Sequence, residues 1–593
     1  MQITRINSAK TEILFKTGNS QQISSKNTHS SNNITVLPSY EVAFTALAKI
    51  TPATKMKMYA EKILSNLHEN QKVHITADSK YLPFMNILSE TAYKKGSGKV
   101  QYKIIEPEFE ALKSKYNITE SFDFERAEKE ALKKENTIFF KFSDKNNPYK
   151  FSGLTPLEEA KEIKKVKSII PQKVYDKFKI SPEEIFKEGL DLKKGQSVVI
   201  LAEREHIPFI TKLMDYLYSK NNTKLIKVHI SEDEKVSMLK YAKNEVLDEF
   251  PTFAKLANEE YLAKDTAYLN LNAGFQNSME GVDTDRLNYL NKTRAKALAE
   301  SSNARFAETP WLIYYVPTTK TCISAYPELK ENPIKAIEQA YTDANKINRI
   351  GKLKEHREAL IHRTNKMNEL AKQGFRKYHY ISYDLKTGKP DGKTDFQIEI
   401  SPKSKFMGPL LEYQKNNHST IPNIPTEESF SAPIANSAEG IISVTKPLLV
   451  NNKLVKGIVL KFKNGKVVDV KADENAEILR KYIQSNENAN RLGEVAFVAD
   501  SPIAKTGRFF NTTLVDENAT CHLALGNAYG DCIEGIDNCK SFKEAQEYLK
   551  ALNINSSPIH KDFMVGGDNV KITAINPETG ETKTIIENDK FQL

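Results

Sequence analysis

The chain has 593 residues, of which 39% are hydrophobic and 27% charged, a composition typical of a globular protein with about three or four domains. Its net charge of +10 comes from 86 Lys and Arg against 76 Asp and Glu, and both signs are mixed along the chain, which argues against a nucleic-acid-binding surface. No segment approaches the roughly 18 apolar residues of a membrane span, and residues 1–20 lack the apolar core of a signal peptide. We therefore predict neither a nucleic-acid partner nor a membrane partner.

The chain contains four cysteines, at positions 322, 521, 532 and 539. Four are too few for a disulfide framework in a chain of this length. Unpaired cysteines are typical of a reducing compartment, so we predict a cytoplasmic location.

The first part of the chain is predicted to be a disordered leader covering residues 1–40. Between Thr17 and Ser39 it is rich in Ser, Asn, Thr and Gln and has few large apolar residues to bury. We expect the function of the protein to lie elsewhere.

An internal repeat follows, because Asn66–Ala77 parallels Asp191–Ala202 at an offset of 125 residues and the match continues without a gap. We predict two copies of one small α/β domain, at 41–170 and, with a helical connection, at 171–372. Each copy is predicted to contain a buried strand, an amphipathic helix and a second strand of a parallel sheet. These elements are Val73–Ala77, Pro83–Tyr93 and Val100–Ile105, and then Val198–Ala202, Pro208–Tyr218 and Leu225–Ile230. Neither first strand leads into a Gly-rich phosphate loop, which argues against dinucleotide binding.

The last part of the chain, residues 373–593, is predicted to be a strand-rich catalytic domain. A long charged helical stretch, Pro333–Lys372, leads into it. A hairpin is predicted around Asn464-Gly465, between strands within Lys453–Phe462 and Lys466–Val470, and one helix at about Ala476–Asn488 interrupts the strands. The predicted fold class is therefore α/β plus α+β, with tandem α/β sheet domains followed by this strand-rich domain.

Carboxylates and imidazoles occur at expected strand or loop ends in four segments of this last domain. Glu494 begins an apolar strand, where a carboxylate is costly to bury without a cation or another partner. His560 and Asp562 are two residues apart, so on a strand both face one side. The other two segments carry Glu427 with Glu428, and Asp516 with Glu517, His522 and Tyr529.

Several carboxylates with two histidines form a ligand set suited to divalent cations such as zinc, cobalt or manganese. Each segment also has a purely structural explanation: Glu427-Glu428 as a solvated turn, His522 as a core histidine, and Asp516-Glu517 as a helix cap. A zinc ribbon of Cys521, His522, Cys532 and Cys539 is a further alternative, although the chain has no Cys-x-x-Cys pair.

The residues of these segments and their order along the chain resemble the motifs of the aminopeptidase T and aminopeptidase S family, the thermophilic-type metalloaminopeptidases. The resemblance is strong over about 371–593 and weaker over about 181–327, so the first repeat copy is extra relative to the family. The matching motifs are Ile424-Pro-Thr-Glu-Glu428, Leu492-Gly-Glu-Val-Ala496, Thr513-Leu-Val-Asp-Glu-Asn-Ala519, His522-Leu-Ala-Leu-Gly526 and His560-Lys-Asp-Phe-Met564.

The resemblance implies a metalloaminopeptidase that hydrolyses the N-terminal peptide bond of peptides with a water activated by two metal ions. It implies a homodimer, with Glu494 as the bridging ligand and Tyr529 as the active-site tyrosine. We predict Glu427, beside a ligand, as the general base. Lys561 departs from the family pattern, which has an apolar residue there. The implied metal ligands are Glu428, Glu494, Glu517, His522, His560 and Asp562.

Two other classes of function stay open. In the first, the chain is a catalytically inactive peptide-binding or scaffold protein, and the extra repeat copy is its working part; the presence of every implied ligand argues against this. In the second, it binds nucleic acid, which would give an affinity that falls steeply with salt. No motif supports this second reading.

Overall fold

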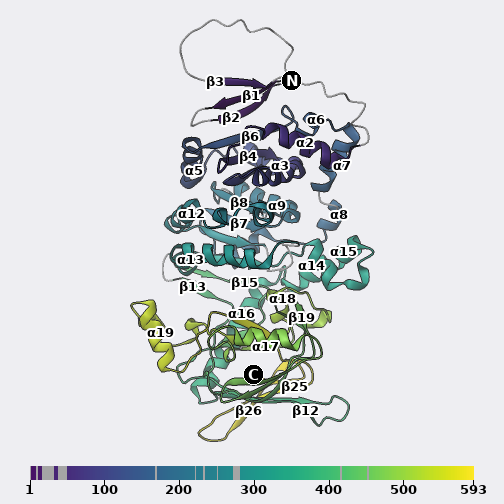
Figure 1. Cartoon of the computed structure of the whole chain (residues 1–593). Helices are drawn as coiled ribbons and strands as arrows, with labels where there is room; N and C mark the ends of the chain where they lie inside the picture. Colours follow the sequence, from purple (N-terminus) through teal and green to yellow (C-terminus); the bar gives the residue numbers. More distant parts are fainter. Residues whose placement is uncertain are drawn as a thin grey trace. The chain divides into compact units, whose positions relative to one another are not determined.

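The computed structural model describes residues 2–7, 11–16, 33–37, 50–166, 170–220, 222–230, 234–249, 252–271, 281–413, 417–450 and 453–593. Contacts divide the chain into two compact units, coloured along the sequence in Figure 1. Unit 1 comprises 1–171, 193–267 and 279–309, and unit 2 comprises 172–192, 268–278 and 310–593. The domain ranges drawn from the sequence stay predictions. Among the described residues, we find no helix with both the length and the apolar character needed to cross a membrane.

The first repeat copy forms a parallel sheet in unit 1. Strand β4 (Lys72–Asp78) pairs in parallel with β5 (Lys99–Ile105) on one side and β6 (Thr137–Phe142) on the other. Residues of β4 alternate between buried and partly buried, and helix α3 (Leu82–Lys94) buries Phe84 and Leu88 in the same hydrophobic core. The further helices of this copy are α2 (Pro52–Ile63), α4 (Pro107–Lys115), α5 (Asp123–Lys134) and α7 (Pro156–Val166).

The second copy repeats this arrangement. Strand β7 (Val198–Ala202) pairs in parallel with β8 (Ile226–Ile230), and helix α9 (Ile207–Ser219) connects them. Helices α3 and α9 both have 13 residues and begin at Leu82 and Ile207, an offset of 125. The predicted parallel α/β class is confirmed. Unit 1 also contains helices α6 (Pro148–Phe151), α10 (Glu234–Tyr241), α11 (Asn244–Leu247), α12 (Thr252–Ala263) and α13 (Thr284–Glu308).

Ion pairs join the two copies within unit 1. Arg204 at the start of α9 donates to the buried carboxylate of Glu106 at 2.6 Å. Lys115 at the end of α4 lies 2.8 Å from Asp215 of α9. Because a buried carboxylate is costly to leave unpaired, the Arg204–Glu106 contact opposes separation of the two copies.

The structure differs from the prediction of a disordered leader. Three strands, β1 (Gln2–Asn7), β2 (Thr11–Lys16) and β3 (Asn33–Leu37), lie within residues 1–40. Strand β1 pairs antiparallel with β2 and β3, and β2 pairs in parallel with β6. Isoleucine, leucine and valine in these short segments favour strands, a local signal that the polar composition of the whole leader obscured. The rest of the predicted leader lies outside the described residues.

The predicted long helix at the entrance to the last domain is two helices in unit 2. Helix α15 (Pro333–Ile347) ends before a turn in which Arg349 and Gly351 have φ of 54° and 80°, and α16 (Leu353–Lys372) follows. A right-handed helix cannot continue through left-handed residues. Nearby, β10 (Trp311–Tyr314) pairs in parallel with β9 (Ala267–Asn270) and with β15 (Asn423–Ile424), and α14 (Thr319–Ala325) follows β10.

The strand-rich domain is built on an antiparallel sheet in the order β21-β20-β17-β12-β11-β25-β26-β27. The predicted hairpin is confirmed: β20 and β21 pair around Asn464 and Gly465, whose φ values are 51° and 74°. The interrupting helix α17 spans Ala476–Gln484. The strands are β11 (Lys377–Tyr383), β12 (Pro390–Glu399), β17 (Glu439–Ser443), β20 (Val459–Lys463), β21 (Lys466–Lys471), β25 (Val570–Ile575), β26 (Thr582–Glu587) and β27 (Lys590–Phe591).

A second antiparallel sheet packs against the same core. Its order is β16 (Ser429–Ser431), β22 (Leu492–Phe497), β23 (His522–Gly526) and β24 (His560–Met564). Val495, Phe497, Leu523, Leu525 and Phe563 are at most 1% exposed and belong to the hydrophobic core that also contains large-sheet residues such as Tyr378 and Phe396. Because side chains alternate along a strand, the opposite face carries the remaining residues of these strands.

A β-bulge in β22 decides which face Glu494 occupies. The pairing of β22 with β23 shifts register between Leu492 and Glu494, so these residues point to different faces although they are two apart. Gly493 permits the bulge, since a Cβ there would lie 2.3 Å from the carbonyl oxygen of Asn527.

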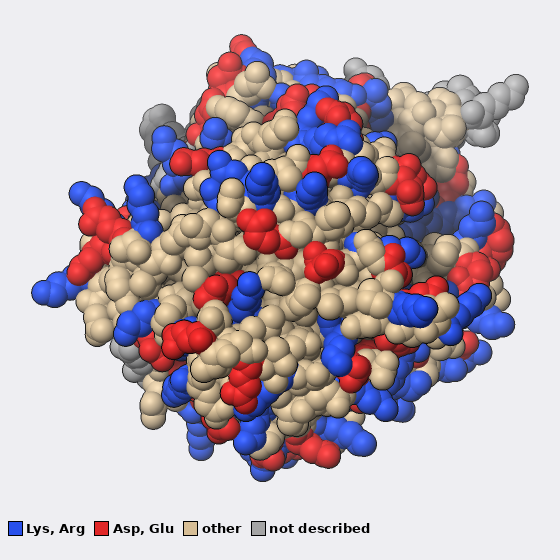
Figure 2. Space-filling model, turned by 90° about the horizontal axis from the view of Figure 1, so that it is seen from below, with Lys and Arg blue, Asp and Glu red and all other residues tan. Residues whose placement is uncertain are grey.

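Acidic and basic side chains are interspersed on the face of the protein seen in Figure 2, in line with the mixed signs of the sequence.

The first prediction concerns this glycine. Gly493→Ala should lower the free energy of unfolding by about 1–3 kcal/mol, because the added methyl group meets backbone atoms that no side-chain rotation can move aside. Chemical denaturation of the full chain measures the change. Gly530→Ala is the matched control, since its Cβ would be 3.7 Å from the nearest atom of Ile536. An equal stability for both variants would contradict the role of the bulge.

Candidate metal centre

Strand register brings the predicted ligands onto one face of the four-stranded sheet. Glu494 of β22, Ala524 of β23 and Asp562 of β24 lie opposite one another in one row. Ala496 pairs with His522 in the next row, and Gly526 pairs with His560. The small side chain of Ala524 between two carboxylates leaves space above the sheet. Alternation along the strands therefore separates a polar face from the buried core face.

The donor atoms on this face form two groups that share one carboxylate. Glu428 Oε2 lies 3.0 Å from His522 Nε2. Glu494 Oε2 lies 3.0 Å from His560 Nε2, which is 3.3 Å from Asp562 Oδ1. One group is Glu428, Glu494 and His522 and the other is Glu494, His560 and Asp562, with donor atoms within 4.8 Å of one another in each. Glu494 is the one described residue that belongs to both groups.

Backbone carbonyls orient both imidazoles. His560 Nδ1 lies 2.7 Å from the carbonyl oxygen of Asn527, and His522 Nδ1 lies 3.3 Å from that of Thr520. Donation from Nδ1 leaves Nε2 as the nitrogen that faces the carboxylates, which is the arrangement typical of metal-bound histidines. The sequence motifs gave no sign of these two carbonyl groups, because a backbone partner can belong to any residue type.

The charged groups of this cluster shift one another's pKa values. Burial alone would lower the pKa of His522, but its hydrogen bond to Glu428 and the neighbouring carboxylates raise it to about 10. For His560 burial is likewise outweighed by hydrogen bonds to Asp562 and Glu494, which raise the pKa to about 11. Burial raises the pKa of Glu494. The carboxylates therefore need positive charge, and the donor set fits divalent cations in the place of these protons.

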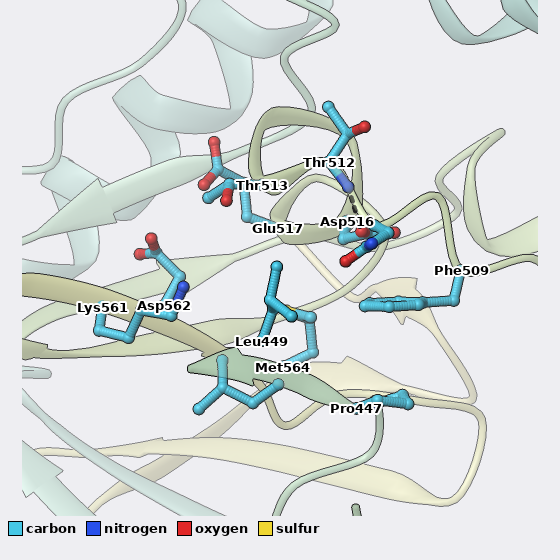
Figure 3. Close-up of a pocket in the computed structure, with 12 residues that line it drawn as sticks. Pro447, Leu449, Phe509, Thr512, Thr513, Asp516, Glu517, Lys561, Asp562 and Met564 are labelled. Atoms are coloured by element: carbon cyan, nitrogen blue, oxygen red, sulfur yellow. Dashed lines mark hydrogen bonds between the residues drawn. The ribbon is translucent and has the colours of Figure 1, made fainter. Parts of the chain in front are cut away.

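The remaining implied ligand comes from a short helix. Helix α18 (Thr513–Glu517) ends at Glu517, while Asp516 accepts hydrogen bonds from the backbone N–H groups of Phe510 and Thr512 at 2.8 and 2.9 Å. Glu517 and Asp562 line the same pocket (Figure 3). Burial, and then the charges of Asp562 and Glu428, raise the pKa of Glu517 well above its ordinary value. Glu517 belongs to neither close group of donor atoms.

Tyr529 lies beside the ligand histidine. Its ring centroid is 4.8 Å from that of His560 and 5.9 Å from that of Phe430. Although Tyr529 is 47% exposed overall, burial around the hydroxyl and then the charge of Glu494 raise its pKa well above the ordinary value. The hydroxyl is therefore a hydrogen-bond donor at neutral pH.

Glu427 points away from the ligand groups. Arg349 donates to both of its carboxylate oxygens, from Nε to Oε1 at 2.9 Å and from Nη2 to Oε2 at 2.7 Å. His356 Nε2 lies 3.5 Å from Oε1, and Arg363 donates to the Glu427 carbonyl oxygen at 3.0 Å. These partners come from the turn between α15 and α16 and from α16, and no motif in the sequence indicated them. The role of Glu427 as a general base stays a prediction.

The zinc-ribbon alternative finds no geometric counterpart. All four cysteines are free thiols, and among the described residues neither group of candidate metal ligands includes a cysteine. His522 lies instead with Glu428 and Glu494.

Comparison with known proteins agrees with this geometry. The family described as thermophilic metalloprotease (M29) matches residues 176–591. The chain belongs to this metalloprotease family. Aminopeptidase 2 of Geobacillus stearothermophilus is 30% identical over 418 residues, which cover 69% of this chain and 95% of the relative. Aminopeptidase AmpS of Bacillus subtilis is 28% identical over 68% of this chain and 95% of its own length. The solved structure of wild-type AmpT from Thermus thermophilus covers 71% of this chain and all of that chain, with 26% identity and a TM-score of 0.62.

The second prediction tests the Arg349–Glu427 contact. Arg349→Met should lower the free energy of unfolding by about 3 kcal/mol, because it leaves the Glu427 carboxylate, which is 1% exposed, without its bidentate partner. The double variant with Glu427→Gln should recover part of this loss, since the buried charge is then absent. Denaturation of the wild type, of both single variants and of the double variant measures the coupling free energy. Equal losses would contradict a stabilising pair.

Proposed function

We propose that this chain is a metal-dependent aminopeptidase that removes the N-terminal residue of peptides with the help of two divalent cations. The observation that carries the proposal is the sharing of Glu494 between two groups of ligand atoms on one sheet face. Membership of a metalloprotease family and relatives named aminopeptidases support it.

The proposed ligands are Glu428, Glu494, Glu517, His522, His560 and Asp562. Carboxylate oxygens can bridge two ions, and imidazole nitrogens favour transition metals, so zinc, cobalt or manganese suits this set. When bound, such cations lower the pKa of a water molecule toward neutrality and polarise a carbonyl group. A homodimer and a cytoplasmic location belong to the same proposal.

The protein's own residues would divide the remaining work. Asn527 and Thr520 hold the imidazoles in orientation through their carbonyl groups. The protonated Tyr529 hydroxyl would donate a hydrogen bond to the oxyanion that develops on the substrate carbonyl. Glu427 stays the proposed general base, and its contacts with Arg349 would also keep the adjacent Glu428 in place as a ligand.

Metal removal and restoration give the third prediction. Release of free amino acids from short peptides should stop after chelation and return with zinc, cobalt or manganese. Glu494→Gln should reduce both bound metal and turnover to background, because it removes the shared charge, while the fold is retained. Metal analysis and amino-acid release measure these effects. Glu534→Gln, an exposed carboxylate of the same domain, is the control. Absence of turnover with every metal would favour the inactive peptide-binding scaffold instead.

Tyr529→Phe gives the fourth prediction. Loss of one hydrogen bond that forms only in the transition state should lower kcat by about 10- to 100-fold and leave KM nearly unchanged. Steady-state kinetics on one neutral dipeptide amide measure both constants. A rise in KM with unchanged kcat would assign Tyr529 to ground-state binding instead.

A further inference from the structure

A pocket in unit 2 lies along the outer side of β24. Within the four-stranded sheet β24 is an edge strand, with β23 on its other side, so residues from both of its faces can reach this pocket. Figure 3 shows Glu517, Lys561 and Asp562 grouped on one side of the pocket, and Pro447 and Phe509 on the other. Leu448, Leu449 and Met564 add further apolar lining.

Among the described residues that line this pocket, Lys561 alone is basic. Its side chain is partly buried, and no described residue forms a hydrogen bond or an ion pair with its ammonium group within the usual distances. The charges that act on it are those of Asp562 and Glu517. A partly buried ammonium without a direct partner is costly to retain unless an anion reaches it at some stage.

The two neighbouring carboxylates are proposed metal ligands. With Glu517 and Asp562 engaged as metal ligands, Asp516 would be the remaining carboxylate of the described pocket lining. Its oxygens already accept hydrogen bonds from the backbone N–H groups of Phe510 and Thr512. The apolar walls raise the strength of an ionic contact there, because they exclude water. The pocket then combines a cation with apolar surface beside two proposed metal ligands, which matches a carboxylate group of a substrate.

We propose that Lys561 is a specificity-determining residue that binds a carboxylate of the peptide substrate. This inference rests on the proposed aminopeptidase activity. The carboxylate has two possible sources with the same chemistry: the C-terminal group of a dipeptide, or the acidic side chain of the substrate's first residue. Leu449 and Met564 would contact the aliphatic part of the same residue.

Two matched pairs of substrates distinguish the sources. Leu-Gly and Leu-Gly-amide differ only in the C-terminal carboxylate, whereas Glu-Gly-amide and Gln-Gly-amide differ only in the side-chain carboxylate. We expect the wild-type, metal-loaded protein to prefer the carboxylate in one pair by at least about tenfold in kcat/KM, as expected for a charged hydrogen bond. Lys561→Met should abolish that preference, and Lys561→Arg should retain part of it.

Lys543→Met is the control, because this lysine side chain is 87% exposed on α19 (Phe542–Ala551). A second readout is independent of turnover: calorimetry with analogues of the preferred substrate pair whose scissile amide is reduced should show tighter binding of the member that carries the carboxylate. A preference that is absent from wild type, or unchanged in Lys561→Met, overturns the inference. Cleavage of the neutral peptides in that case leaves the aminopeptidase proposal intact, whereas no cleavage of any peptide overturns the activity itself.

Discussion

Four carboxylates and two imidazoles lie close together at one sheet face of the strand-rich domain. The carboxylates repel one another and attract the imidazoles, so the surrounding structure must hold these charges in place. Glu428 and Glu494 are 8% and 4% exposed, so water cannot screen their charges well. The same carboxylates raise the pKa values of both imidazoles. A cluster of this kind is stable only when positive charge is present, and this requirement links the folding of the site to its chemistry.

The surroundings of the site supply rigidity. The core face of the four-stranded sheet packs with the large antiparallel sheet in one hydrophobic cluster, which fixes the strands that carry the ligands. Asn527 and Thr520 orient the histidines, and Asp516 holds the loop before α18. The turn between α15 and α16 places Arg349 against Glu427, next to Glu428. These contacts keep the proposed ligands, which belong to four separate segments, in register.

The first repeat copy lies before the part of the chain that the metalloprotease family covers. The metalloprotease family match begins at residue 176, whereas β4, α3 and β5 lie before it. The buried core of this copy also includes Met238, Leu239 and Leu290 of the second copy. The two copies are further joined by ion pairs of Arg204 with Glu106 and of Lys115 with Asp215. The proposed catalytic residues all lie in the part of the chain that the family covers.

The sequence alone determined the local elements and the types of ligand. Periodicity located α3, α9 and the Asn464-Gly465 hairpin, and the motifs named the carboxylates and imidazoles that the structure brings together. The tertiary structure decided how these pieces meet. It split the predicted long helix at Arg349 and turned Glu427 toward that arginine. Through the bulge at Gly493, it also placed the side chains of Leu492 and Glu494 on different faces of the sheet. It also set Lys561 beside a pocket at the edge of β24. Periodicity is a property of neighbouring residues, whereas register, bulges and ion-pair partners depend on residues distant in the chain, and only packing brings those together.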